Sequence, residues 1–592
     1  MTPYDPPQRD LRFVIEELIG LDQVSGLDGL ETITPDLLEA VLEEAGRLAA
    51  DAWAPHNLSG DREGCQLRDG QVHTPAAFAE AYQAFVSGGW NGITAPTDWG
   101  GQALPELLGS AVTELWNAAN PALALCPLLT ASATELLARH GDETLRGRYL
   151  EKMVTGEWTG TMNLTEPQAG SDLSTVRSLA TPEGDHYRLQ GQKIYITWGE
   201  HALADNIIHL VLARTPDAPP GNRGISLFLV PKYLPDDNGQ PGERNDVHCV
   251  SIEHKLGIHA CPTCTLSYGE NGGAIAYRVG ETGRGLNHMF TMMNEARHKI
   301  GVQAIGIADR AWQQARAFAA ERIQGRLPDH TEPVAILEHP DVRRMLMGMR
   351  AQTEAMRALA LVNAAAMDCA RHGTDPGMRE AAQRRVDLLT PLVKAIASDW
   401  AIEVASTGIQ VHGGMGYVEE TGAAQFLRDA RIAPIYEGTN GIQAQDFTLR
   451  KVLKDRGAAL QELLAEVAET VTATETDSRL ADLGTALRGA LNGLQASTEH
   501  LLNTNEHDPR GTLAAATPFM HQAGIVLGGW LMLRAALTAQ ARIDDGSSDP
   551  FYPAKLATAR FYAVHVLPRA EACRPGVTDG DAALNGLDDV TV

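Results

Sequence analysis

The sequence predicts a mainly α-helical protein with a central β domain. Long amphipathic stretches flank one region of short, β-branched segments, so the order is helices, strands, long helices and further helices. Helices and strands do not alternate, which argues against a doubly wound α/β sheet. The chain of 592 residues is long enough for several domains and a large buried core. We expect four domains, with the boundaries 1–158, 159–279, 280–452 and 453–592.

The first two domains differ in texture. The segment 35–53, PDLLEAVLEEAGRLAADAW, repeats apolar residues at the three- and four-residue spacing of one helical face. Gly and Pro clusters in 91–105 break the first domain into loops. The second domain contains the β-branched stretches 187–197, 206–215 and 224–234, separated by turn-forming residues. This pattern predicts a small barrel or sandwich.

Helical patterning returns in the third domain. The runs 287–324, 339–372 and 378–414 each predict a long helix, and about 35 residues give about 50 Å of helix. A fourth helix is expected after the loop 433–441. Four such helices predict an antiparallel four-helix bundle. Further amphipathic helices follow in the C-terminal extension, 453–592.

Charge and cysteine content limit the function classes. The chain has 49 Lys and Arg against 75 Asp and Glu, a net charge of −26, which disfavours general binding to nucleic acids and anionic membranes. Seven cysteines, an odd number, do not form a disulfide framework and indicate a reducing compartment. The N-terminal residues show no secretory signal pattern. The most apolar stretch, 523–539, is broken by Arg534 and predicts a buried helix. We therefore expect a cytoplasmic protein with no integral membrane segment and no nucleic-acid partner.

Several common motifs are absent. The sequence has no GxGxxG between a strand and a helix, no phosphate-binding P-loop, no GxSxG and no HExxH. The CxxC at 261–264 lacks the second pair of ligands that a zinc site needs, so we expect ordinary thiols and no metal site.

Three other stretches contain candidate chemistry: MNLTEPQAGSD (162–172), KIYITWGE (193–200) and the segment 410–443. Within the last, Glu437 follows the apolar run APIY and precedes Gly438, in a loop between two predicted helices. A Glu in a loop is most often a solvated carboxylate. An aromatic neighbour and closely approaching backbone can instead raise the pKa of a Glu towards neutrality, as a general base requires.

In this order and spacing, the motifs TEPxAGSD, K-x-x-IT, GGxGY, RDARI and IYEGTxxIQ resemble the acyl-CoA dehydrogenase family from about residue 40 to 450. The resemblance is greatest to its C-terminally extended bacterial subgroup, which includes 3-methylmercaptopropionyl-CoA dehydrogenases. It implies N-terminal helices, a middle β-barrel and a four-helix bundle, with FAD bound between barrel and bundle without GxGxxG. The implied reaction, a step of fatty acid metabolism, oxidises an acyl-CoA to a 2-enoyl-CoA. The implied substrates are 3-(methylthio)propanoyl-CoA or a medium- or long-chain acyl-CoA.

The resemblance also assigns roles to residues. Glu437 matches the base that removes the proton α to the thioester carbonyl, while the β-carbon passes hydride to flavin N5. Hydrogen bonds from the base's own backbone N–H and a flavin ribityl hydroxyl stabilise the carbonyl. The expected FAD-binding residues are Met162, Leu164, Thr165, Gly170, Ser171, Tyr195, Thr197, Arg322, Gln410, Gly413, Gly414, Thr439 and Gly441. The expected substrate-binding residues are Ser171, Asn294, Arg297 and Gly438.

Partners follow from the same resemblance. The matches at Arg322 and at 410–414 usually cross a subunit interface, so a homodimer is expected, and an electron-transfer flavoprotein is the expected acceptor. The chain departs from the family at Tyr195, where many members have Trp, and at Trp198, where many have Asn. It also departs at Gln324–Gly325 and at Pro340. These changes concern the flavin and adenine contacts and leave the base unaffected.

Three alternatives stay open at this point. An acyl-CoA oxidase would share the fold and the base but pass electrons to O₂. A flavin-containing DNA-binding relative of the alkylation-response type would need a basic surface, and residues 451–592 contain 12 basic and 18 acidic residues, a net charge of −6. A catalytically idle helical scaffold is disfavoured by the intact IYEGTNGIQ loop.

Overall fold

The computed structural model describes residues 2–328, 330–580 and 584, and these form two compact units. The barrel unit comprises Glu44–Leu104 and Leu115–Lys299. The bundle unit comprises Met1–Glu43, Pro105–Glu114 and Ile300–Val592. The four-domain division of the chain stays a prediction.

The barrel unit contains all the strands that the structure describes. They are β1 (Gln66–Arg68), β2 (Gln71–His73), β3 (Trp158–Asn163), β4 (Leu179–Glu183), β5 (His186–Thr197), β6 (Asn206–Arg214), β7 (Ile225–Pro231), β8 (Tyr233–Pro235), β9 (Pro241–Arg244), β10 (Val247–Ile252), β11 (Thr263–Tyr268) and β12 (Ala274–Val279). Eight of them form one sheet in the order β10-β11-β5-β12-β7-β6-β3, and β4 pairs with both β5 and β6. This double pairing closes β5, β12, β7, β6 and β4 into a ring, which confirms the predicted middle β-barrel.

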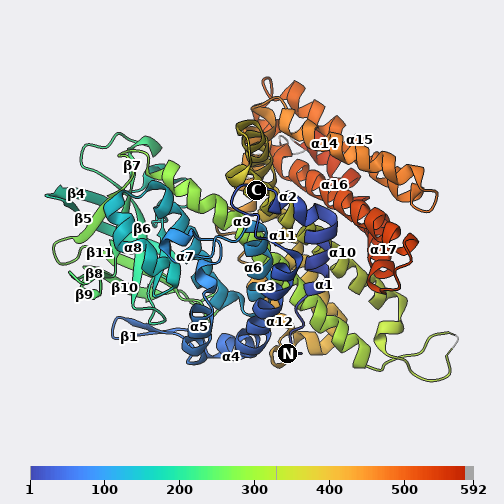
Figure 1. Cartoon of the computed structure of the whole chain (residues 1–592), viewed down its shortest axis with the longest axis horizontal. Helices are drawn as coiled ribbons and strands as arrows, with labels where there is room; N and C mark the ends of the chain where they lie inside the picture. The colour runs from blue at the N-terminus through green and yellow to red at the C-terminus, as the bar shows by residue number, and fades with distance from the viewer. Residues whose placement is uncertain (1, 329, 581–583, 585–592) are drawn as a thin grey trace. The chain divides into compact units, whose positions relative to one another are not determined.

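Side-chain alternation fills the barrel. Val211, Phe228, Val230 and Leu266 belong to one cluster of buried residues from several strands. Strand β6 is buried along most of its length because its two faces are both covered, so it reads as a continuous apolar run rather than an alternating one. Helix α7 packs on β3, and Figure 1 shows α7 and α8 beside the strands of the barrel.

The N-terminal part of the chain is helical, as predicted. Its helices are α1 (Gln8–Arg12), α2 (Leu21–Ser25), α3 (Pro35–Leu48), α4 (Asn57–Glu63), α5 (Ala77–Ser87), α6 (Glu106–Ala119), α7 (Pro121–His140) and α8 (Glu143–Thr155). The predicted run 35–53 is α3 continued by one π-helical turn, Ala49–Trp53. Asn120 and Asp142 cap α7 and α8, because each side chain accepts a hydrogen bond from a backbone N–H of the first turn.

Three long helices form the bundle: α9 (Gly285–Glu321), α10 (Pro340–His372) and α11 (Pro376–His412). Helices α9 and α11 approach closely at Gly301, where a Cβ would lie 2.8 Å from the Val393 carbonyl oxygen. The fourth helix is shorter than the other three. After α12 (Ala423–Ala430) comes α13 (Asn440–Gln445), which a π-helical stretch continues to Leu453.

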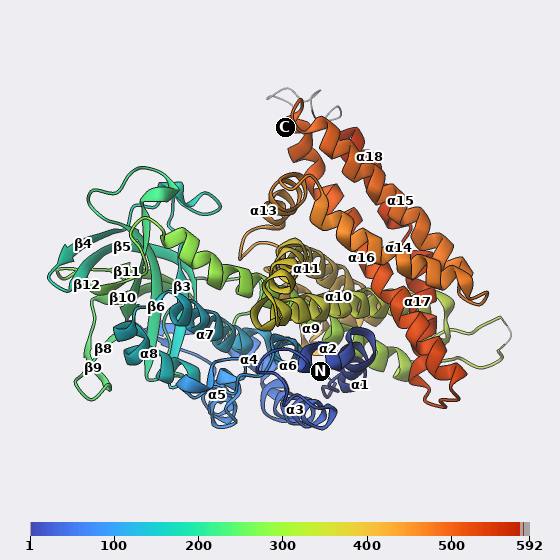
Figure 2. The ribbon, with the colours of Figure 1, turned by 45° about the horizontal axis from the view of Figure 1, so that its top comes forward.

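The C-terminal extension consists of α14 (Ala458–Thr476), α15 (Ala481–Thr504), α16 (Pro509–Asp544), α17 (Phe551–Phe561) and α18 (Arg569–Thr578). Helices α14, α15 and α16 lie side by side (Figure 2), and α16 also packs on α10 and α13. The predicted buried helix at 523–539 is confirmed as part of α16.

Two of the described helices, α7 and α16, are long and apolar enough to cross a membrane by length and composition alone. In each, 83% of the apolar window is buried inside the structure. Core helices of folded proteins meet the same test, and the burial of both windows identifies them as such.

Candidate active site

The segment 162–172 leaves the end of β3 and turns at the barrel surface. Met162 is buried within β3, and Leu164 and Thr165 follow the strand in half-buried positions. The Thr165 carbonyl accepts a hydrogen bond of 3.0 Å from the Ile194 N–H, which ties this exit to β5. Gly170 and Ser171 are exposed at the turn.

One buried carboxylate organises this turn. Glu166 accepts hydrogen bonds from the Arg177 N–H (2.7 Å) and from Ser178 Oγ (2.6 Å). Its Oε1 also lies 2.8 Å from the fully buried Lys193 Nζ. Burial alone would raise the pKa of Glu166, but the charge and hydrogen bonds of these partners lower it to about 2. Lys193 also donates to the Leu164 carbonyl, at 2.9 Å.

Strand β5 presents an exposed aromatic ring beside that turn. Tyr195 is 61% exposed and has φ +59°, a left-handed conformation that is uncommon for a bulky residue. Trp198 shares this conformation at φ +52°, but its indole is buried and donates to the Ala122 carbonyl at 3.1 Å. Thr197 is half-buried between them. Strained backbone of this kind is frequent at ligand-contacting positions.

The predicted substrate residues on α9 lie one turn apart. Arg297 is buried while Asn294 is exposed, and Nη1 of Arg297 lies 3.5 Å from Oδ1 of Asn294. The guanidinium also lies 5.9 Å from the centre of the Phe290 ring. Both residues belong to the barrel unit.

The base loop, which we define as residues 434–440, belongs to the bundle unit. Glu437 is half-buried and has φ +55°, and Gly438 follows with φ +81°. The Gly438 carbonyl accepts a hydrogen bond of 2.8 Å from Lys394 Nζ and one of 3.3 Å from Gln443 Nε2. Thr439 caps α13, because its Oγ1 accepts from the Ile442 N–H. The carboxylate thus extends from a backbone whose unusual conformation is fixed by neighbouring side chains.

The remaining predicted cofactor residues lie at helix ends in the bundle unit. Arg322 is exposed just after α9, and Gln410 is exposed near the end of α11. Gly413 needs to be glycine for its own backbone, since φ is +61°. Gly441 is exposed at the start of α13.

The glycines provide a test of whether the predicted residues fit FAD. A Cβ added at Gly170, Gly413 or Gly414 would meet no atom within 4 Å. Gly170 and Gly414 also have no left-handed backbone that would require glycine. The backbone at these two glycines is open to close approach by a ligand, as it also is at Gly489 outside the predicted site. The space there is compatible with the flavin dinucleotide that the sequence resemblance implies.

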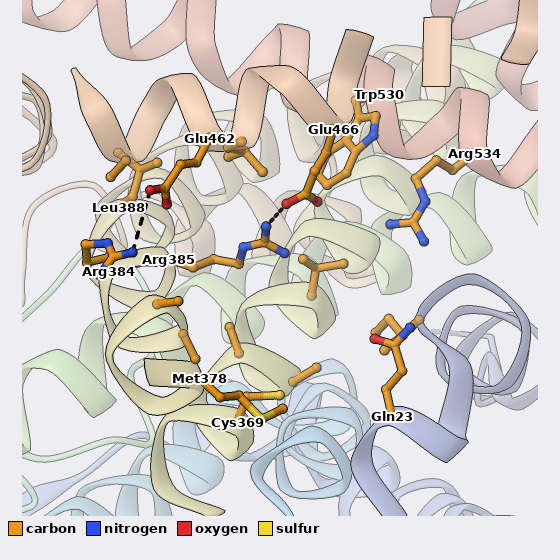
Figure 3. A pocket seen from close by; sticks show the side chains of 18 of the residues that line it. Gln23, Cys369, Met378, Arg384, Arg385, Leu388, Glu462, Glu466, Trp530 and Arg534 are labelled. Atoms are coloured by element: carbon orange, nitrogen blue, oxygen red, sulfur yellow. Dashed lines mark hydrogen bonds and ion pairs between the residues drawn. The ribbon is translucent and has the colours of Figure 1, made fainter. Parts of the chain in front are cut away.

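Two cavities lie in the bundle unit. Figure 3 shows the larger, of about 680 Å³, between α10, α11, α14 and α16. No predicted cofactor or substrate residue lines it, and the guanidinium of Arg385 there is paired with Glu466. The smaller, of about 420 Å³, is lined by Gln410 together with Arg344 and Arg569. Among the described residues no cluster of three or more His, Cys, Asp or Glu could hold a metal ion.

Glu166, Lys193 and Lys394 are positioning residues that sequence reasoning missed. Glu166 lies inside the motif TEPxAGSD and Lys193 inside K-x-x-IT, so both residues could have been singled out from the sequence. The motifs do not show that the two side chains pair. Lys394 lies in the middle of α11, with no motif around it.

Four family models match nearly the whole chain in sequence. They are described as acyl-CoA dehydrogenase, N-terminal domain (residues 36–157), acyl-CoA dehydrogenase, middle domain (161–270), acyl-CoA dehydrogenase, C-terminal domain (283–450), and acetyl-CoA dehydrogenase C-terminal like (463–588).

Individual relatives agree with these matches. A protein of Ruegeria pomeroyi named 3-methylmercaptopropionyl-CoA dehydrogenase is 45% identical over 98% of this chain and 99% of its own length. A protein of Mycobacterium tuberculosis named broad-specificity linear acyl-CoA dehydrogenase is 33% identical over the full length of both chains. Among solved structures, an acyl-CoA dehydrogenase complexed with FAD from Bacillus anthracis has a TM-score of 0.75 and 20% identity, covering 96% of this chain and 91% of its own. This last likeness concerns the fold.

Proposed function

This chain belongs to the acyl-CoA dehydrogenase family and is an oxidoreductase of acyl-CoA thioesters, and from that premise we propose that Glu437 is the base of an FAD-dependent conversion of an acyl-CoA to a 2-enoyl-CoA. The observation that carries this assignment is the base loop itself. Its only carboxylate lies on left-handed backbone that side-chain hydrogen bonds from Lys394 and Gln443 hold in place. Such preorganisation keeps a reacting group in one position.

The chain's residues divide the chemistry among them. The Glu437 carboxylate removes the α-proton, and the Glu437 backbone N–H donates to the thioester carbonyl, where negative charge develops. Bound FAD would supply the acceptor for the hydride that leaves the β-carbon. Ser171, Asn294, Arg297 and Gly438 bind the acyl-CoA.

The cofactor residues supply binding and orientation. Tyr195, Thr197 and the segment 162–171 of the barrel unit would bind the flavin ring, as would Thr439 and Gly441 of the bundle unit. Gly413 and Gly414 would admit the dinucleotide close to the backbone, and Arg322 would bind its pyrophosphate. The exposure of Arg322 and Gln410 on the single chain supports a homodimer in which each subunit completes the other's cofactor site.

The substrate proposed is 3-(methylthio)propanoyl-CoA or a medium- or long-chain acyl-CoA. The Ruegeria relative, similar along its whole length, supports the first, and the Mycobacterium relative supports linear chains. A panel of acyl-CoAs that includes both kinds, with kcat/KM measured for each, ranks them directly.

The base assignment is tested with Glu437→Gln. The amide cannot take the α-proton, so anaerobic bleaching of bound flavin by the preferred acyl-CoA should slow by about 10³-fold, the typical contribution of a general base. The variant should retain bound FAD, read from its visible spectrum. Glu499→Gln changes an exposed carboxylate on α15 and serves as the control. Bleaching of Glu437→Gln at the wild-type rate would show that another group is the base.

The acceptor proposed is an electron-transfer flavoprotein. Reduced enzyme should pass electrons to it much faster than to O₂. Steady peroxide formation at the rate of substrate turnover would instead identify an acyl-CoA oxidase. The cytoplasmic location stays a prediction.

A further inference from the structure

A chain of hydrogen bonds connects the base loop to the C-terminal extension. It begins at Lys394 on α11, whose side chain is fully buried. Lys394 Nζ donates to the Gly438 carbonyl at 2.8 Å and to Asn440 Oδ1 at 2.9 Å. One ammonium group therefore holds two points of the loop, one of them on the residue directly after Glu437.

The amide nitrogen of Asn440 extends the chain of hydrogen bonds. Its Nδ2 donates to Asp399 Oδ1 at 2.8 Å and to the Ala395 carbonyl at 3.1 Å. The Asn440 backbone N–H donates to the Pro434 carbonyl at 2.9 Å, which closes the loop on itself. Asn440 thus fixes the end of the loop to α11 through both the oxygen and the nitrogen of its side-chain amide.

The last member lies in the extension. Asp399 Oδ2 accepts from His521 Nε2 at 3.0 Å, and His521 is on α16. A second contact supports the same junction, since the rings of Phe447 and Phe519 lie 5.5 Å apart. Helix α16 therefore makes a polar contact with α11 at Asp399 and an aromatic contact with the π-helical stretch after α13 at Phe447.

The backbone conformation of the base loop requires restraint by neighbouring side chains. A glutamate with φ +55° followed by a glycine with φ +81° occupies a conformation that an unrestrained loop would leave. Hydrogen bonds to the carbonyl next to Glu437 oppose that change. Asp399 orients Asn440, and His521 in turn orients Asp399, as outer partners orient inner ones in many active sites.

We propose that the C-terminal extension is a positioning part of the catalytic centre, in which His521 acts through Asp399, Asn440 and Lys394 to hold Glu437. The proposal rests on the assignment of Glu437 as the base. None of the four is assigned a contact with the reacting atoms, so all four are positioning residues.

The central test uses His521→Leu, which removes the donor to Asp399 at a site that is about one-third exposed. Backbone hydrogen exchange of a peptide covering residues 436–445 should become about tenfold faster, since this loop loses part of its restraint. With the preferred acyl-CoA, kcat should fall about tenfold while KM and bound FAD stay within twofold. His521→Gln keeps an N–H donor and should recover most of both losses.

Two controls separate positioning from general destabilisation. Trp530→Phe removes a different single hydrogen bond of α16, that from Nε1 to Thr470 Oγ1 at 2.9 Å, and His507→Ala changes an exposed histidine before α16. Neither should change exchange at 436–445 or kcat. If His521→Leu behaves like Trp530→Phe in both measurements, the proposal is wrong.

A double-mutant cycle gives a second test. Asp399→Asn and His521→Leu break the same chain of hydrogen bonds, so their effects on kcat should not add, whereas additive effects would overturn the proposal. Hydrogen exchange needs no substrate, so it tests the positioning role of His521 independently of the assignment of Glu437 as the base. Wild-type bleaching by Glu437→Gln with an exchange response in His521→Leu would refute the base assignment alone. Loss of bleaching in Glu437→Gln without that response would refute the positioning role alone.

Discussion

At the scale of single residues, Glu166 shows how the turn after β3 depends on one buried carboxylate. Its side chain is 3% exposed and pairs with Lys193, which is fully buried. The pKa of Glu166 lies near 2, below the usual 4.5, because burial is outweighed by Lys193 and the donors from Ser178 and Arg177. The charged form is therefore the one that stabilises the fold, above about pH 4.5, and this stabilisation is lost as the pH falls towards 2.

Glu166→Gln should lower the free energy of unfolding by about 3 kcal/mol at neutral pH, since 2.5 pKa units correspond to about that much. The difference from wild type should narrow as the pH falls from about 4.5 towards 2, because the carboxylate is protonated near pH 4.5 in the unfolded chain and only near pH 2 in the folded one. Urea unfolding at several pH values measures it. Glu183→Gln, an exposed partner of Arg188, is the control. A difference independent of pH would contradict the pKa argument.

At the scale of elements, the turn after α11 differs from an ordinary helix end. Gly413 has φ +61° and ψ −141°, a region of backbone conformation that glycine enters far more readily than other residues, so its identity follows from its backbone. Gly414 does not share this conformation and has open space at its Cβ position. Such a residue is available for contact with a ligand.

Gly414→Ala should leave the thermal stability of the FAD-free protein unchanged or slightly raised, because a Gly to Ala change at compatible backbone restricts the unfolded chain. FAD binding should weaken by about tenfold if the dinucleotide lies against this backbone, a loss of about 1.4 kcal/mol. Flavin fluorescence titration measures the affinity. Gly489→Ala on α15, also with open space at Cβ, should change stability but not FAD affinity. Unchanged FAD affinity in Gly414→Ala would remove this turn from the cofactor site.

At the scale of the molecule, a buried charge network joins distant parts of the bundle unit. Lys555 Nζ on α17 contacts Asp10 Oδ1 on α1 and lies 2.7 Å from Glu354 Oε2 on α10. Arg357 binds Asp10 as well and pairs with Glu114. Burial raises the pKa of Glu114 to about 7 despite that arginine. The network connects the N-terminal helices, the bundle and the extension in a single arrangement.

Lys555→Met should lower the free energy of unfolding by about 3–5 kcal/mol, since it leaves two buried carboxylates with one cation fewer. Arg560→Met, on the same helix, removes a partly exposed pair with Asp482 and should cost less than about 1 kcal/mol. Denaturant unfolding of both variants provides the comparison. Equal losses would mean that the extension does not depend on the buried network.

The sequence predicted much of the fold because its patterns are local. Periodicity of apolar residues predicts the run 35–53 and the three long helices, and β-branched segments predict the strands of the barrel. The length of the fourth bundle helix was harder to predict, since α13 passes into a π-helical stretch that periodicity does not distinguish. The closure of the barrel through β4 depends on pairing between strands and has no local pattern.

By itself, the sequence determined the family, the class of reaction and the candidate base, because these depend on motifs whose residues are close together in the chain. Only the tertiary structure decided what holds those motifs in place. Glu166 meets Lys193 across 27 residues, Asp399 meets His521 across 122, and Asp10 meets Lys555 across 545. Hydrogen bonds and ion pairs between such distant positions leave no spacing in the sequence, since they exist only once burial has brought the elements together.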